Sequence, residues 1–232
     1  MIEAKLKRHL RSFWAVSKTW VISHRASLLL LLVGVFLPLQ VFGELAEDVW
    51  ENEGGFSWDV PILLAIHARA NPQLDAVVTI LTRFGVFWGV FPAAIIISIF
   101  LLLRRRLHRL TYFLITLLGA TVLNRVAKAM LHRVRPQLWT SPAPELDYGF
   151  PSGHAMASMT LVVALIVLTW GSYWCWVVAL AGGAFVLMIG WTRLYLGVHY
   201  PSDILAGWAA SIAWAIGVKM LIRFPSPPKI QN

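Results

Sequence analysis

Two histidines in the second half of the chain have neighbours that could make them reactive. His199 precedes Asp203 by four positions, and Pro201 lies between them at the start of an apolar stretch. A carboxylate one helical turn away can hold one imidazole nitrogen and leave the other free to attack phosphorus. His154 could then protonate the departing oxygen as a general acid. This pattern permits nucleophilic chemistry at His199, although a histidine alone at this position would more often be an interfacial hydrogen-bonding group.

Three cations accompany these histidines in the sequence: Lys128, Arg135 and Arg193. Lys128 and Arg135 are seven residues apart, so on a helix they would lie two turns apart on one side. Any one of the three alone would more often extend to lipid headgroups. Together, beside two histidines, they favour a phosphate pocket, in which arginine supplies a fork for paired oxygens and lysine a point charge.

Ser152 and Gly153 stand at the start of another apolar stretch, directly before His154. Serine is a common N-cap, glycine permits close approach to the backbone, and the free amides of a helix start attract anions. An ordinary helix cap after Pro151 is the plainer interpretation. The two interpretations are compatible, because a capped helix start is also an anion site.

No set of carboxylates resembles a metal cage. Asp203 serves His199, and Glu145 and Asp147 stand alone in a loop. The three cations would stabilise the phosphoryl oxygens that a metal ion otherwise serves. We therefore expect neither a metal nor another cofactor.

The composition indicates a membrane protein. Hydrophobic residues make up 58% of the 232, charged residues make up 13%, and the mean hydropathy is +0.68. So little polar sequence remains that a large soluble core could not be covered, which disfavours that alternative. We expect an all-α polytopic protein with six transmembrane helices, because six stretches approach the roughly 20 residues that cross a bilayer. They are residues 27–45, 85–103, 110–127, 155–170, 173–190 and 204–221.

Residues 60–84 are too interrupted by polar side chains to cross a membrane. Asn71 and Pro72 resemble an N-cap and a first helical residue, and apolar residues follow them at helical spacing. We expect one or two amphipathic helices at the outer interface. They could wall a lipid entry path or simply connect the first two spans.

The charge distribution predicts how the chain is oriented. With a cytoplasmic N-terminus, the inner side receives most of the 20 Lys and Arg residues and a single acid, as the positive-inside rule requires. Both termini are then cytoplasmic, and the basic arm, residues 1–26, lies on anionic headgroups. The six-span unit is residues 27–222, and residues 223–232 form a tail. The net charge of +9 therefore needs no nucleic acid to explain it.

The residues that could do chemistry fall into three clusters, all on the outer face in this topology. Residues 128–136 read KAMLHRVRP, residues 151–154 read PSGH and residues 192–203 read TRLYLGVHYPSD. In this order they resemble the three-part signature of the type 2 phosphatidic acid phosphatase (PAP2) superfamily. That superfamily includes bacterial phosphatidylglycerophosphate phosphatases and undecaprenyl diphosphate phosphatases. With the six-span plan, the resemblance extends over most of the chain.

The resemblance implies a role for each residue of these clusters. Five of them would hold the phosphoryl group: Lys128, Arg135, Ser152, Gly153 and Arg193. His154 would protonate the leaving oxygen, and His199, braced by Asp203, would form a phosphohistidine that water later hydrolyses. Thr192 stands where the family usually has serine, and its hydroxyl is expected to keep the phosphate contact.

We therefore expect a metal-independent lipid phosphatase of a bacterial inner membrane, with its site on the outer face. Its substrate could be phosphatidylglycerophosphate, undecaprenyl diphosphate or phosphatidic acid, because the motifs contact phosphate and not the tail. A phosphotransferase that moves phosphate from a polyprenyl diphosphate to another acceptor is the alternative. The superfamily also includes, more distantly, vanadium haloperoxidases; a site of that kind is disfavoured because those relatives are soluble and this chain is mostly membrane span. A transporter is disfavoured because the span centres are almost free of charge. The oligomeric state is left open.

Overall fold

The computed structural model describes residues 23–51 and 56–222, and this part of the chain contains helices and no strand. The first helical stretch, Ser23–Glu51, includes a short π-helical segment, η1 (Leu32–Phe36), followed by α2 (Leu37–Glu51). The helices that follow are α3 (Asp59–His67), α4 (Pro72–Arg83), α5 (Val90–Leu103), α6 (Leu107–Leu131), α7 (Gly153–Thr169), α8 (Trp174–Tyr195) and α9 (Pro201–Leu221). The expected all-α class is confirmed. Most of the basic arm and the whole C-terminal tail lie outside the described residues.

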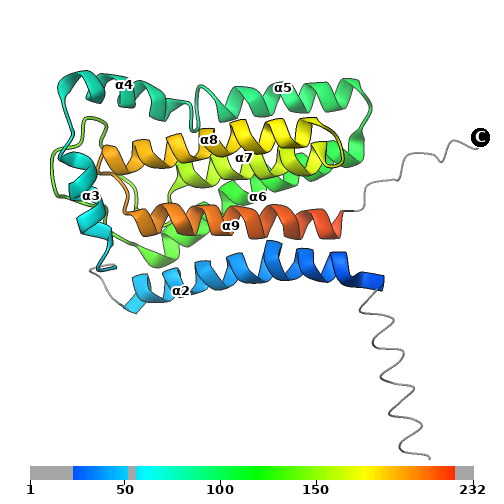
Figure 1. Ribbon diagram of the computed structural model, residues 1–232, viewed down its shortest axis with the longest axis horizontal. Coiled ribbons are helices and arrows are strands. Elements are labelled where there is room, and N and C mark those ends of the chain that lie inside the picture. The colour runs from blue at the N-terminus through cyan, green and yellow to red at the C-terminus, as the bar shows by residue number, and fades with distance from the viewer. Residues whose placement is uncertain (1–22, 52–55, 223–232) are drawn as a thin grey trace, which may run out of the picture.

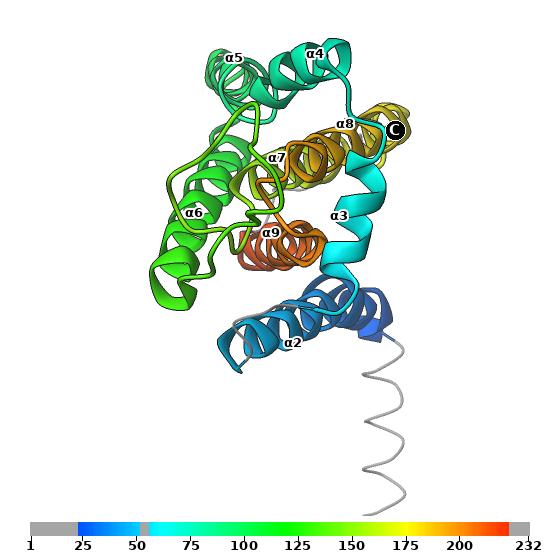
Figure 2. The same ribbon diagram turned by 90° about the vertical axis from the view of Figure 1, so that its left-hand side faces the viewer.

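The long helices form an elongated bundle with α7 near its centre. Figure 1 shows α2, α5, α6, α7, α8 and α9 running along the long axis, with α3 across one end. Seen from that end, α7 and α9 lie in the middle of the other helices (Figure 2). Helix α7 packs against α5, α6, α8 and α9. It meets α8 so closely at Gly182 that a Cβ there would lie 2.7 Å from Cγ1 of Val162.

The outward faces of the bundle are apolar. Ile96 on α5, Leu118 on α6 and Leu180 on α8 are each more than 60% exposed. An apolar surface of this extent fits lipid rather than water. Within the described residues, four helices are long and apolar enough to cross a membrane: Ser23–Glu51, Leu107–Leu131, Trp174–Tyr195 and Pro201–Leu221. The chain is therefore an integral membrane protein with at least these candidate spans.

Helices α5 and α7 are apolar but shorter, with 14 and 17 residues. At 1.5 Å per residue they extend for about 21 and 26 Å, less than the roughly 30 Å of a hydrocarbon core. Figure 1 shows that α4 and α5 follow one another along the same edge of the bundle. The second stretch of the sequence analysis, residues 85–103, therefore begins too early, because residues 84–89 form turns that separate the two helices.

The break between α4 and α5 has a local cause. A Cβ at Gly89 would lie 2.3 Å from the carbonyl oxygen of Phe84, so the tight turn requires glycine at this position. Upstream, Asn71 caps α4 by accepting a hydrogen bond from the amide of Leu74, and Pro72 is the first helical residue. This start is as the sequence predicted. The segment 60–84 holds two helices, α3 and α4, and their place at the interface stays a prediction.

Candidate active site

The residues singled out in the sequence meet at the end of the bundle that carries α3. Lys128 lies near the end of α6, His154 near the start of α7 and Arg193 near the end of α8. His199 lies between α8 and α9, and Asp203 lies in the first turn of α9. Adjacent antiparallel helices bring alternate ends together, so residues that are distant in the sequence become neighbours here. The three clusters thus meet at one end of the bundle, and the side of the membrane on which they lie stays a prediction.

His199 is fully buried and is held at both ring nitrogens. Its Nδ1 lies 3.3 Å from Oδ2 of Asp203, and Nη1 of Arg135 donates to Nε2 at 2.9 Å. Arginine can only donate, so Nε2 is the acceptor and Nδ1 carries the proton toward the carboxylate. Burial lowers the pKa of His199 well below the usual 6.5, and the charges of Arg135 and Arg193 lower it further. The imidazole is therefore neutral at pH 7, with its lone pair on the side of the cations.

The carboxylate behind His199 is part of a buried network that the sequence analysis missed. Arg133 donates to Oδ1 of Asp203 at 2.5 Å and to Asp59 at 2.8 Å. Asp59, at the start of α3, also accepts from the amide and the hydroxyl of Ser202 at 3.0 and 2.6 Å. Asp203 thus serves Arg133 as well as His199. Arg133 lies within the KAMLHRVRP segment, but no spacing signalled Asp59, which is 143 residues from Ser202 in the chain.

Lys128 and Arg135 do not share a helix, contrary to the sequence analysis. Helix α6 ends at Leu131, and His132 adopts a left-handed conformation with φ of 48°, which turns the chain into a loop. Arg135 returns to the site because its Nη1 donates to the carbonyl of Val198 at 2.7 Å. The two cations are therefore brought together by the loop and not by helical periodicity.

Glu145 and Asp147 are not alone in their loop, which is a second correction. Glu145 pairs with Arg193 and with Arg135, the latter at 2.6 Å, and Asp147 pairs with Lys128 and Arg135. Arg193 also donates to Oγ1 of Thr82 on α4 at 2.6 Å. Every one of the three cations is therefore bound to a carboxylate of the loop 132–152.

Ser152 is the N-cap of α7 and accepts from the amide of Ala155 at 3.5 Å. Gly153 is the first residue of that helix, so the predicted capped start is confirmed. Thr192 is buried, and its hydroxyl donates to the carbonyl of Ile189 at 2.7 Å. In this arrangement the hydroxyl proton of Thr192 is directed within α8, and its phosphate contact stays a prediction.

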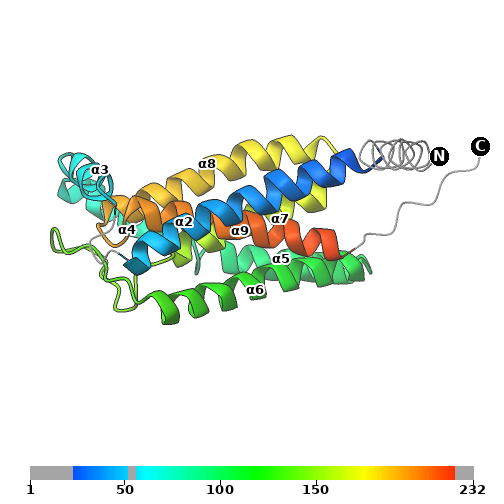
Figure 3. The ribbon, with the colours of Figure 1, turned by 90° about the horizontal axis from the view of Figure 1, so that it is seen from below.

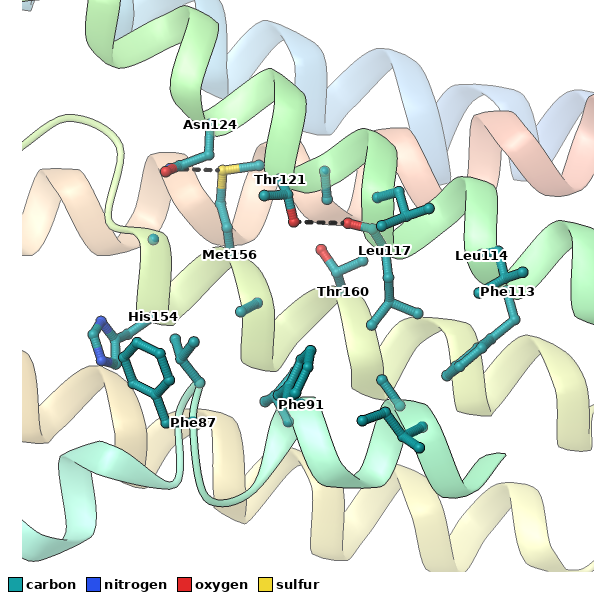
Figure 4. A pocket seen from close by; sticks show the side chains of 18 of the residues that line it. Phe87, Phe91, Phe113, Leu114, Leu117, Thr121, Asn124, His154, Met156 and Thr160 are labelled. Carbon is teal, nitrogen blue, oxygen red and sulfur yellow. Dashed lines mark hydrogen bonds between the residues drawn. The ribbon is translucent and has the colours of Figure 1, made fainter. Parts of the chain in front are cut away.

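An apolar cavity of about 690 Å³ opens directly at the polar residues. It runs between α5, α6 and α7, from His154 and Phe87 at one end to Phe113 and Leu114 at the other (Figure 4). Lys128, Glu145, Asp147 and Gly153 also line it, so the polar site and the apolar cavity are continuous. The break between α4 and α5 places Phe87 at the junction of the two parts.

Fold and site together define a membrane-embedded helical protein that presents three cations and a neutral, carboxylate-bound histidine to an anion. The PAP2 superfamily pattern matches residues 109–225, half of the chain, and the chain belongs to this superfamily. It is 27% identical over 205 residues to "Undecaprenyl-diphosphatase" of Sulfolobus acidocaldarius, covering 86% of this chain and 93% of that protein. It is 30% identical over 147 residues to "Phosphatidylglycerophosphatase B" of Bacillus subtilis, covering 61% and 72%.

A solved structure is similar as well. The crystal structure of a transmembrane PAP2-type phosphatidylglycerolphosphate phosphatase from Bacillus subtilis superposes with a TM-score of 0.70 and 27% identity. The superposition covers 79% of this chain and 94% of that one. The chain is accordingly a membrane phosphatase of the PAP2 type. Among residues 23–51 and 56–222, no group of three His, Cys, Asp or Glu side chains is arranged to hold a metal ion.

Proposed function

We propose that the chain hydrolyses the terminal phosphate of a lipid phosphate or diphosphate through a phosphohistidine on His199. The observation that carries the proposal is the continuity of the cationic site with the apolar cavity. A phosphate held by the cations leaves its hydrocarbon tail beside the apolar walls of α5, α6 and α7. A soluble phosphate ester has no apolar tail to occupy such a cavity, whereas a lipid has one.

The first chemical step is attack of Nε2 of His199 on phosphorus. An N–P bond forms as the P–O bond to the lipid breaks, and His154 gives a proton to the leaving oxygen. His154 lines the cavity as well as the polar site, which suits a group that meets the oxygen next to the tail. Lys128, Arg135 and Arg193 stabilise the charge on the phosphoryl oxygens. Asp203 stabilises the positive charge that the imidazole gains.

The second step is hydrolysis of the phosphohistidine. Water attacks phosphorus and gives a proton to His154, which now acts as the base. The N–P bond breaks, its electron pair returns to Nε2, and inorganic phosphate is released. Three cations serve all the phosphoryl oxygens in this scheme, so we propose that no metal ion takes part.

We further propose that six helices cross the membrane and that the site faces outward. The described chain begins and ends at the same end of the bundle, opposite the site (Figure 3). An even number of crossings gives this arrangement when α5 and α7 also cross. The turn between α5 and α6 carries Arg104, Arg105 and Arg106, and positive turns favour the cytoplasm. That side is the one away from His199.

The test of the proposed function is release of inorganic phosphate by the purified protein in detergent micelles. We expect turnover of phosphatidic acid, phosphatidylglycerophosphate or undecaprenyl diphosphate in the presence of EDTA, with kcat/KM ranking the three lipids. Free phosphate from a labelled donor without any acceptor distinguishes hydrolysis from phosphotransfer. No release from any of the three lipids, with or without divalent metal, would contradict the proposal.

Narrowing the cavity should weaken binding of the tail selectively. Ala94 of α5 is half-buried and lines the cavity, so Ala94→Phe inserts a ring where the tail is expected to lie. We expect KM for a long-chain phosphatidic acid to rise about tenfold or more, since a few buried methylenes are lost, while a dihexanoyl analogue changes little. Ala181→Phe, on the exposed face of α8, is the matched control. Equal effects on both chain lengths would exclude the cavity as the tail site.

A further inference from the structure

Glu145 lies where the substrate's phosphoryl group is expected. One carboxylate oxygen pairs with Arg193 and the other pairs with Arg135 at 2.6 Å. The same two oxygens lie 3.7 Å from Nδ1 of His154 and 3.8 Å from Nε2 of His199. The carboxylate is thus positioned between the proposed nucleophile and the proposed acid, with both forked cations bound to it.

The charge of Glu145 makes it an effective competitor for the cations. Burial alone would raise the pKa of Glu145, but the charges of Arg193 and Arg135 outweigh it and hold the pKa below its usual value. The side chain is therefore ionised at neutral pH. Nη2 of Arg193 and Nη2 of Arg135 are released by Glu145 when a phosphoryl group takes its place.

The segment that carries Glu145 is attached to the site mainly by charge. Asp147, two residues on, pairs with Lys128 and Arg135 and is 59% exposed, and Leu146 between them is fully exposed. Since the middle residue buries no side chain, withdrawing the segment costs ion pairs and little apolar contact. An incoming anion can displace the segment if it forms equally favourable ion pairs with the same cations.

We propose that Glu145 is an internal competitor that keeps the cations clear of the phosphodiester headgroups of ordinary lipids while still admitting terminal phosphates. This inference rests on the proposed function, which places the site among headgroups. A phosphodiester carries one negative charge, so its electrostatic interaction with the cations is no more favourable than that of the carboxylate it displaces. A terminal phosphate carries a charge of about −1.5 to −2 at pH 7, so its interaction with the cations is more favourable. Occupancy by Glu145 lowers the apparent affinity of every anion by the same factor, the fraction of time the site is free. The weakly held phosphodiester then no longer occupies the site, whereas the more strongly held terminal phosphate still does.

Glu145→Gln removes the competing charge with little change in shape. In neutral detergent micelles we expect KM for phosphatidic acid to fall about tenfold, because charge-assisted hydrogen bonds no longer have to be broken. We also expect phosphatidylglycerol, a phosphodiester, to inhibit the variant at a concentration about tenfold lower than it inhibits the wild type. Glu47→Gln, at an exposed position of α2, is the matched control and should behave as wild type.

A binding measurement separates this inference from the proposed function. Orthovanadate should raise the melting temperature of Glu145→Gln at lower concentration than that of the wild type, whether or not any lipid is hydrolysed. Glu145→Ala gives the same readings if the glutamine variant fails to fold. Equal vanadate response and equal inhibition by phosphatidylglycerol in variant and wild type would overturn the role of Glu145. Absence of phosphate release from the wild type would instead overturn the proposed function.

Discussion

Replacing His199 with asparagine is expected to reduce phosphate release by roughly 10⁴-fold or more, because the attacking nitrogen is lost. Asparagine places its amide near the position of Nδ1 and can still hydrogen-bond to Asp203, while Arg135 keeps Val198, Glu145 and Asp147 as partners. The measurement is single-turnover release of labelled phosphate from a lipid phosphate. Acid quenching during turnover should trap label on the wild-type protein and none on the variant.

The matched control for this change is His132→Asn. His132 is exposed, packs edge-on against Tyr148 and has a left-handed backbone that asparagine tolerates. We expect near wild-type activity from it. Turnover by His199→Asn within tenfold of the wild type would show that another group attacks phosphorus, and the covalent step would have to be abandoned.

The second large effect is expected from substitution of Arg133, a residue that is not proposed to contact the substrate. Its side chain is 4% exposed and links the buried carboxylates of Asp59 and Asp203. In Arg133→Ala both carboxylates lose their cation, and breaking a buried pair costs about 3–5 kcal/mol of unfolding free energy. For a chain of this size that corresponds to a melting temperature lower by roughly 10 °C. Arg125→Ala, at an exposed position of α6, should leave the melting temperature near that of the wild type.

Measurements of enzyme activity should test the network of Arg133, Asp59 and Asp203 independently of its effect on stability. Measured well below the melting temperature, Arg133→Ala should lower kcat more than it changes KM, because Asp203 loses the anchor that orients His199 and not a phosphate contact. Adding Asp59→Asn to Arg133→Ala should restore part of the lost stability, since one unpaired charge is removed. Fully additive losses in the double variant would argue against the network as described.

Features that depend on neighbouring residues could be predicted from the sequence. The caps at Asn71 and Ser152 and the helix start at Pro201 follow from local backbone preferences, and the structure has all three. The meeting of the three motifs at one end of the bundle was also predictable, because alternating apolar stretches fix which loops share a face.

Features that depend on contacts between distant segments could not be predicted. Helical spacing suggested one helix for Lys128 and Arg135, but the left-handed turn at His132 separates them. Asp59 had no sequence partner, since its hydrogen bonds reach Ser202 across most of the chain. Glu145 carried no signal for a similar reason, because its importance comes from Arg193 on another helix.

The hydrogen bond from Arg135 to Nε2 of His199 has a consequence for when the chemistry can begin. The lone pair that is proposed to attack phosphorus accepts this hydrogen bond, so in the proposed mechanism the bond must break before attack. Arg135 is also one of the groups that a phosphoryl oxygen attracts. In the proposed mechanism, a phosphoryl group that attracts the guanidinium frees the lone pair in the same movement, so that recognition of phosphate and exposure of the attacking atom become one event.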